Sequence, residues 1–177
     1  MTKKKITDFL QTELSNILKP RLLQVGYIPP ILERRYPGHL EWLNVFFDVL
    51  SMERRRKGNF AIWEIEISGG GCEWNVVKCK EILTWTWKPT LFMFHIFSPL
   101  TSHRKTYSKQ KARELKNEYG RKLRYYQMDL DFSVDRFQRM VDAFDRSQYS
   151  AKQYYGKELK AELRQIVKKS LEKLSHR

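Results

Sequence analysis

The sequence predicts a single domain of the α/β class. Apolar residues recur at helical spacing over residues 4–23, and runs rich in β-branched and aromatic residues, closed by glycine or proline, occupy much of residues 31–68. A second helical pattern and then a continuous apolar run over residues 90–97 give the order helix, three strands, helix, strand. The 177 residues, 41% of them hydrophobic, suffice for one substantial core. No repeat, low-complexity segment or linker indicates a second domain, so we treat residues 1–177 as one.

The first helical pattern carries a carboxylate in an unexpected place. At 100° per residue, Glu13 falls between Leu10 and Ile17, inside the apolar stripe rather than on the polar side. A carboxylate there is costly unless it is paired, hydrogen-bonded or bound to metal. Two interpretations stay open: Glu13 reaches a functional site, or it lies at the edge of the stripe and pairs with a local Lys or Arg.

Two predicted strands bring three carboxylates to one end of a sheet. Residues 42–52 form an apolar run with Asp48 near its middle, where strand propensity disfavours an Asp. Residues 61–68 form the next strand, in which side chains alternate, so Glu64 and Glu66 share one face and apolar side chains cover the other. If the two strands pair as a hairpin, the three carboxylates come together. Hard divalent cations prefer such oxygen ligands.

A helix is expected over residues 73–87, because the pattern stops before Pro89. Lys78 projects from its apolar face, which includes Trp74, whereas Lys80 points elsewhere. A lysine on an apolar face usually extends its amine to water. Beside carboxylates it can instead offset the negative charge that develops on a phosphate.

The apolar run over residues 90–97 predicts a fully buried central strand. His95 lies within it and is expected to be a buried, hydrogen-bonded histidine rather than a metal ligand. Residues 103–123 then form a strongly basic helix.

The last part of the chain predicts one more strand and two helices. On the strand over residues 124–132, Asp129 and Asp131 share a face and form the second-ranked metal site, because no upstream acid or following lysine accompanies them at comparable spacing. Ser133 is the expected N-cap of the next helix. The final helix, residues 150–174, has an apolar stripe that either packs on the core or forms the seam of a homodimer.

The charge of the chain favours a polyanionic partner, and nucleic acid is the commonest one. The formal net charge is +14, and residues 101–177 hold 20 of the 34 Lys and Arg residues but only 10 of the 20 Asp and Glu residues. No apolar run is long enough to span a membrane, and the basic N-terminus lacks the apolar segment of a signal peptide. With two cysteines and no export signal, we expect an intracellular, reduced protein without a zinc site.

Two basic segments are the expected contacts to phosphates. One is a hairpin loop that ends in the turn pair Gly58-Asn59, and the other begins the basic helix. The residues concerned are Arg54, Arg55, Arg56, Lys57, Arg104, Lys105 and Lys109.

This order of elements and acids resembles the PD-(D/E)XK nuclease superfamily, whose pattern is an acidic residue and, after a gap, (D/E)-x-K. Asp48 is similar to the first acid and Glu64 to the second. Glu66 stands where the family's lysine belongs, which is a departure from the pattern. Some members have Glu there, and others move the basic residue to the following helix, where Lys78 falls. Glu13 is similar to the acid that the first helix often contributes.

The resemblance covers about residues 5–100 and implies the restriction-endonuclease-like fold, an αβββαβ core with a mixed central sheet. Residues 101–177 would then form a basic α/β extension with additional C-terminal helices. The resemblance also implies a metal-dependent DNA endonuclease.

In the mechanism that the resemblance implies, Asp48 and Glu64 hold Mg²⁺ or Mn²⁺ against the scissile phosphate. Glu66 takes a proton from the attacking water or completes a second metal site. Lys78 stabilises the transition state, and Glu13 binds the metal through water. The departure at Glu66 leaves open whether the site is competent.

Two other interpretations fit the sequence. One is a nucleic-acid-binding protein without catalysis, on a degenerate nuclease-like fold or an unrelated one, which would bind without metal. The other is a basic assembly protein that oligomerises through its last helix. Metal dependence separates nuclease from binding protein, and concentration-dependent mass separates the assembly protein from both.

Overall fold

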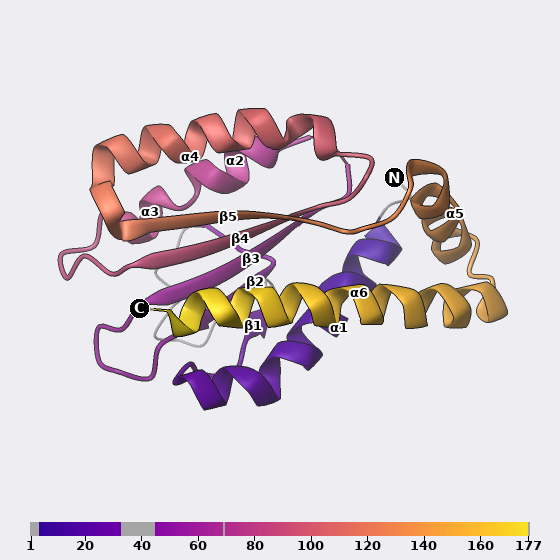
Figure 1. The fold of residues 1–177 in the computed structure, drawn as a ribbon, viewed down its shortest axis with the longest axis horizontal. Coiled ribbons are helices and arrows are strands. Elements are labelled where there is room, and N and C mark those ends of the chain that lie inside the picture. Colours follow the sequence, from indigo (N-terminus) through magenta and orange to yellow (C-terminus); the bar gives the residue numbers. More distant parts are fainter. Residues whose placement is uncertain (1–3, 33–44, 69, 177) are drawn as a thin grey trace.

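The computed structural model describes residues 4–32, 45–68 and 70–176, which form a sheet with helices on both of its faces (Figure 1). This confirms the α/β class. The N-terminal half contains α1 (Lys4–Leu22), η1 (Leu23–Val25), β1 (Ile31–Leu32), β2 (Val49–Met52), β3 (Phe60–Glu66), α2 (Cys72–Val77) and α3 (Lys80–Leu83). The remainder contains β4 (Leu91–Phe97), η3 (Ser102–Arg104), α4 (Lys105–Tyr119), η4 (Gly120–Lys122), β5 (Leu123–Asp129), α5 (Val134–Asp145) and α6 (Tyr149–Ser175).

The strands of the described residues lie in the order β1-β2-β3-β4-β5. The first three pair antiparallel, and β3, β4 and β5 are mutually parallel, so the sheet is mixed as expected. The crossover from β3 to β4 contains α2 and α3, and the crossover from β4 to β5 contains α4. Because parallel neighbours end at the same edge, the carboxyl ends of β3, β4 and β5 lie together.

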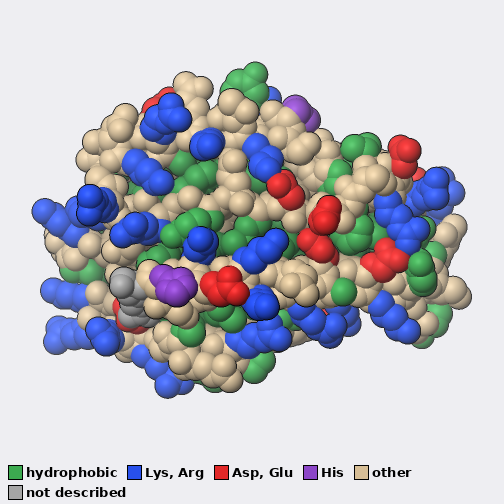
Figure 2. Space-filling view, in the orientation of Figure 1, with side chains coloured by type: hydrophobic (Ala, Val, Ile, Leu, Met, Phe, Trp, Pro, Cys, Tyr) green, Lys and Arg blue, Asp and Glu red, His purple; other side chains and the backbone are tan. Residues whose placement is uncertain are grey.

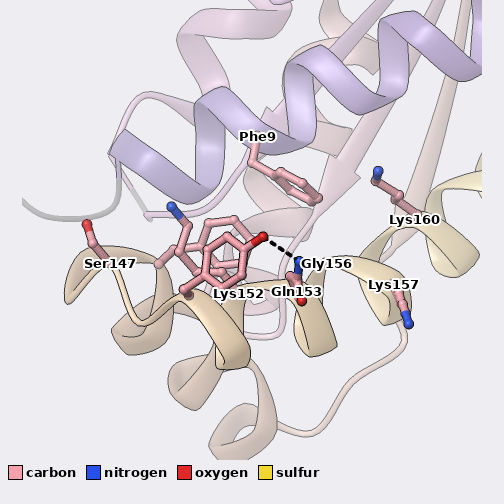
Figure 3. Close-up of a pocket in the computed structure, with 9 residues that line it drawn as sticks. Phe9, Ser147, Lys152, Gln153, Gly156, Lys157 and Lys160 are labelled. Atoms are coloured by element: carbon pink, nitrogen blue, oxygen red, sulfur yellow. Dashed lines mark hydrogen bonds between the residues drawn. The ribbon is translucent and has the colours of Figure 1, made fainter.

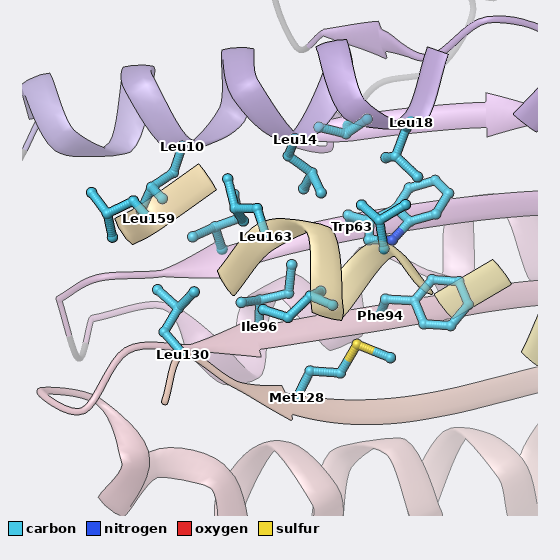
Figure 4. Packing of buried hydrophobic residues seen from close by; sticks show 14 of the residues in the cluster. Leu10, Leu14, Leu18, Trp63, Phe94, Ile96, Met128, Leu130, Leu159 and Leu163 are labelled. Carbon is cyan, nitrogen blue, oxygen red and sulfur yellow. The ribbon is translucent and has the colours of Figure 1, made fainter. Parts of the chain in front are cut away.

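One face of the sheet carries an apolar core beneath α1, α5 and α6 (Figures 1 and 4). The sheet contributes Trp63 and Phe94, which stack with ring centroids 5.2 Å apart. Leu14 of α1 and Leu163 of α6 meet above them, both fully buried. The apolar stripe of α6 is thus used within the chain, where it packs against α1 as well as the sheet.

The opposite face lies beneath α2, α3 and α4 and changes character along the strands. Phe60 and Ile62 of β3 and Met93 of β4 belong to a second apolar cluster. Toward the carboxyl ends of the same strands, the buried side chains become polar: Glu64, Glu66 and His95. Alternation within β3 therefore places both acids on one face, as the sequence predicts.

The helix expected over residues 73–87 is two short helices instead. Between α2 and α3 the backbone tightens to hydrogen bonds three residues apart, from the amide of Cys79 to the carbonyl of Val76 and from that of Glu81 to that of Lys78. The predicted apolar face is also wrong at Trp74, which is 62% exposed, because Cys72 and Val76 point inward.

The strand expected over residues 42–52 is shorter than predicted. Residues 42–44 lie outside the described part of the chain, and β2 begins only at Val49. Asp48 therefore lies immediately before the strand rather than in its middle. Of the first of the three strands predicted within residues 31–68, the described part is the two-residue β1.

Other predicted elements agree with the structure within a few residues. The helix over residues 4–23 is α1, the buried central strand is β4, and the basic helix is α4 with a 3₁₀ turn at each end. Ser133 caps α5, since its hydroxyl accepts a hydrogen bond from the Arg136 amide at 3.2 Å. The strand expected over residues 124–132 ends at Asp129, so Asp131 lies beyond it.

Candidate functional site

Asp48 is held in place from two sides before β2 begins. Its Oδ2 atom accepts a hydrogen bond from the backbone amide of Ile65 at 2.7 Å, and Oδ1 accepts one from the side-chain amide of Gln11 at 2.7 Å. The carboxylate thus accepts the hydrogen bond that the Ile65 amide of β3 would otherwise donate to a backbone carbonyl. This contact fixes the orientation of the Asp48 side chain. An Asp in this apolar segment has a structural reason that strand propensity does not provide.

Glu64 and Lys78 form a buried ion pair beside Asp48. The distance from Lys78 Nζ to Glu64 Oε1 is 2.9 Å, and the side chains are 11% and 2% exposed. Lys78 Nζ also donates to the carbonyl oxygen of Phe46 at 2.6 Å and lies 5.1 Å from the ring centroid of Phe47. Lys78 follows α2 directly, so the turn between α2 and α3 delivers it to the site.

The electrostatics of this cluster favour the protonated form of Glu64 more than water does. Burial, and next the negative charge of Asp48, raise the pKa of Glu64 well above its usual value, although Lys78 acts in the opposite direction. The negative charge of Asp48 therefore acts on Glu64 in a region of low dielectric constant.

Glu66 belongs to a separate hydrogen-bond chain. Its Oε1 atom accepts from the Asn75 side-chain amide and lies 2.8 Å from His95 Nε2. Burial acts to raise the pKa of Glu66, but hydrogen bonds from His95 and Asn75 hold that pKa below its usual value. Glu66 is therefore ionised at neutral pH.

The chain continues from His95 across β4 to β5. Burial lowers the pKa of His95, so the ring is neutral at neutral pH. A neutral ring that donates from Nε2 to Glu66 must accept at Nδ1, and Tyr125 Oη lies 2.9 Å away. Tyr125 in turn accepts from Gln127 at 3.1 Å. The expectation of a buried, hydrogen-bonded histidine is confirmed.

Glu13 lies on α1 away from these acids. Its carboxylate pairs with Lys160 of α6 at 3.2 Å, which matches the second interpretation of its place in the apolar stripe. The residue of α1 that contacts Asp48 is Gln11. Gln11 is a neutral amide, so no pattern of carboxylates in the sequence indicates it.

Asp48 and Glu64 meet only some of the requirements for binding a hard cation such as Mg²⁺. Within the described ranges, no three His, Cys, Asp or Glu side chains are grouped closely enough to hold a metal ion. Asp48 and Glu64 supply two carboxylates, and Mg²⁺ in proteins often takes one or two, with waters and substrate oxygens completing the shell. Lys78 is paired with Glu64 Oε1. A cation bound to that oxygen would have to share it with the Lys78 amine or displace the amine.

The site is more enclosed than the sequence suggested. Glu64 is 1% exposed and Glu66 is 4% exposed, whereas Asp48 is half-buried. The exposed side chain nearest in sequence to Asp48 is Phe46, at 51%. Of the two carboxylates proposed to bind metal, Asp48 is therefore the more exposed.

The expected phosphate contacts divide between the two ends of the sheet. Arg104 and Lys105 follow β4 and lie at the end that holds the acids, where they pair with Glu73 at 3.8 Å and Asp129 at 2.6 Å. Lys109 is exposed one turn further along α4. Lys and Arg side chains are spread widely over the face of the molecule drawn in Figure 2.

The basic loop over residues 54–57 lies at the opposite end of β3, in the turn between β2 and β3. All four side chains are exposed. The turn needs Gly58, because a Cβ atom there would lie 2.7 Å from the Glu53 Cβ atom. A strand of seven residues is about 20 Å long, so this loop and the acids are far apart.

Comparison of the chain with protein-family models, curated proteins and solved structures gave no match. None of the helices in the described residues combines the length and apolar character that crossing a bilayer requires. Cys72 and Cys79 are both buried free thiols. The geometry of the acids and the charge of the chain are what support a function.

Proposed function

We propose that this chain is a metal-dependent endonuclease that hydrolyses phosphodiester bonds in DNA, on a restriction-endonuclease-like fold. The observation that carries the proposal is the cluster of Asp48, Glu64 and Lys78, gathered where β2 begins and β3 ends. Carboxyl groups with strongly perturbed pKa values concentrate at functional sites. The order of helix, three strands, helix and strand supports the fold.

The roles of the residues follow from their contacts. Mg²⁺ or Mn²⁺ bound by Asp48 and Glu64 would lower the pKa of a water molecule and offset charge on the scissile phosphate. Gln11 and the Ile65 amide orient the Asp48 carboxylate in advance. Lys78, whose amine already bonds to Glu64, would donate to a phosphate oxygen as negative charge develops.

Glu66 has a supporting role in this proposal. A lowered pKa makes its carboxylate a weaker base, so it is poorly suited to take a proton from water. It is also committed to Asn75 and His95. We assign it to holding the carboxyl ends of β3 and β4 in register behind Glu64.

Substrate binding is assigned to the basic residues at the same end of the sheet. Arg104, Lys105 and Lys109 would neutralise backbone phosphates near the acids, and the loop over residues 54–57 would contact the nucleic acid about 20 Å away. Binding would therefore weaken steeply as salt is added.

A second candidate is a nucleic-acid-binding protein without catalysis. The burial of Glu64 and its closed ion pair with Lys78 favour it, since the pair satisfies both side chains without a metal. Both candidate functions use the basic surface to bind nucleic acid. They differ in whether adding metal leads to cleavage of the bound nucleic acid.

The test is cleavage of labelled linear, nicked, branched and single-stranded DNA, and of a matched RNA, with Mg²⁺, Mn²⁺ or EDTA. We expect cleavage only with metal, and a loss of about a hundredfold or more in Glu64→Gln and Lys78→Met. Lys80→Met is the matched control, because Lys80 pairs with Glu118 on the surface of the same segment.

Binding of wild type and Glu64→Gln to DNA with equal affinity, and no cleavage with either metal, would overturn the nuclease and leave the binding protein. Cleavage that survives in Glu64→Gln would place the active site elsewhere. Cleavage lost equally in Lys80→Met would remove Lys78 from the mechanism.

A further inference from the structure

A hollow of about 490 Å³ lies between α1, α5 and α6, apart from the acids (Figure 3). Cavities of this size suit small molecules or single units of a polymer. Its lining comes from three segments that are distant in sequence: Phe9 of α1, Phe144 of α5 with Ser147 after it, and residues 149–160 of α6.

The floor of the hollow is aromatic. Phe9 and Phe144 lie with ring centroids 4.9 Å apart. Gly156 of α6 closes the floor, and a Cβ atom there would come within 3.3 Å of Phe9, tighter than most such contacts. Glycine at this position therefore lets α6 approach Phe9 (Figure 3).

The rim is cationic and carries an exposed aromatic ring. Lys152 Nζ lies 5.6 Å from the ring centroid of Phe144, and within the described part of the chain neither Lys152 nor Lys157 forms an ion pair with a carboxylate. Lys160 is partly neutralised by Glu13. Tyr149 is 75% exposed, and its hydroxyl accepts a hydrogen bond from Gln153 at 2.9 Å.

We propose that this hollow binds one unstacked nucleotide of a single-stranded nucleic acid. A nucleotide combines a planar face with an anionic group, which matches an aromatic floor and rim beside two lysines that pair with no carboxylate among the described residues. The base lies against Phe9 and Tyr149, and the phosphate lies between Lys152 and Lys157. This inference rests on the proposed nucleic-acid function and names the kind of substrate.

The hollow and the acids lie on opposite sides of α1. Phe9 and Gln11 are two residues apart, so their side chains point about 200° apart around the helix axis. Phe9 faces the hollow and Gln11 contacts Asp48. Since a helix with its side chains is about 10–12 Å wide, a strand held in the hollow reaches Asp48 within a few nucleotides.

The test measures equilibrium binding of a fluorescent 12-nucleotide single strand and a 12-base-pair duplex to the full chain in EDTA. We expect Tyr149→Ala to weaken single-strand binding by about tenfold and to leave duplex binding within about twofold. Lys157→Glu is expected to weaken single-strand binding more than duplex binding. Both residues are exposed, so folding should be unaffected, which thermal melting verifies.

Two control variants make the same changes outside the hollow. Tyr107→Ala removes another exposed tyrosine, on α4, and Lys168→Glu reverses another exposed charge on α6. We expect Tyr107→Ala to leave the preference for single strands in place, and Lys168→Glu to affect both ligands to the same degree. Equal losses on both ligands in Tyr149→Ala, or no loss on either, would overturn the inference.

The outcomes also separate this inference from the nuclease. If the protein prefers single strands in a way that depends on Tyr149 but shows no metal-dependent cleavage, nucleotide binding in the hollow is supported and the proposed nuclease activity is overturned. If metal-dependent cleavage occurs without that preference, the nuclease activity is supported and nucleotide binding in the hollow is overturned. No binding to either nucleic acid would remove both.

Discussion

The two faces of the central sheet use the same strand in opposite ways. Toward α1 and α6, β3 presents Trp63 and Ile65 to a mainly apolar core. Toward α2 and α4 it presents Ile62 and then Glu64 and Glu66, so that face becomes polar at the carboxyl end. Both faces carry an apolar cluster, and the second face also carries buried charge, which is costly to stability.

This difference locates the site on physical grounds. The carboxyl ends of parallel strands are where ligands commonly bind in α/β folds. Here the apolar cluster stops at that end, and acids that are costly to bury replace it. Loss of an apolar or hydrogen-bonded side chain should therefore lower stability, whereas removal of the buried charge of Glu64 should raise it, and three substitutions test this.

The largest loss is expected from Phe94→Ala on the apolar face. Phe94 is fully buried and stacks between Trp63 and Tyr126, with ring centroids 5.2 and 5.4 Å away. Truncation leaves a cavity, so the free energy of unfolding should fall by about 3–5 kcal/mol, measured by urea denaturation. Trp74→Ala is the control, because an exposed ring should cost roughly 0.5 kcal/mol or less. A loss below that of Trp74→Ala would contradict the assignment of this face.

A smaller loss is expected from His95→Ala on the polar face. The change leaves Glu66 without one of its hydrogen-bond donors and Tyr125 without its acceptor. An unsatisfied buried polar group costs about 1–3 kcal/mol, so urea denaturation should show a loss in that range. His103→Ala, at an exposed position, should be neutral. An equally neutral His95→Ala would mean that the hydrogen-bond chain adds nothing to stability.

A gain is expected from Glu64→Gln. Burial and Asp48 raise the pKa of Glu64, so the folded state keeps a proton over a pH range in which the unfolded state has lost it. Wild type therefore loses stability as pH rises above about 4.5, and the neutral variant does not. A gain of about 1 kcal/mol at pH 8 would raise Tm by roughly 2–4 °C.

The pH dependence is the sharper measurement for this variant. The difference in Tm between Glu64→Gln and wild type should grow from pH 5 to pH 8, and the conservative change Glu114→Gln on exposed α4 should show no such growth. A difference that shrinks as pH rises would mean that Lys78 neutralises Glu64 fully.

Much of the fold follows from local patterns in the sequence. The stripe of α1, the unbroken apolar run of β4 and the Ser133 cap each depend on neighbouring residues alone, and each is confirmed. The alternation that puts Glu64 and Glu66 on one face is confirmed for the same reason. Lys78 was matched to the acids by a resemblance, and the structure brings it to Glu64.

The predictions that were wrong concern segments whose structure depends on contacts with residues distant in sequence. The expected helix over residues 73–87 divides in two at Lys78 and Cys79, and Lys78 bonds there to Glu64 and to the carbonyl of Phe46. The apolar run predicted that the second strand extends through Asp48, but Asp48 bonds to the Ile65 amide with its side chain. No spacing rule in a single sequence reveals such partners.

The packing of α1 against α6 has a consequence for how the chain folds during synthesis. Leu14 and Leu163 are more than a hundred residues apart, and at about 5–20 residues per second α6 is made roughly 6–25 seconds after α1. During that interval the stripe of α1 lacks the helix that covers it. Contacts between such distant segments also slow folding. Until its last helix has been made, the nascent chain therefore exposes apolar side chains of α1, which are the kind of surface that chaperones bind.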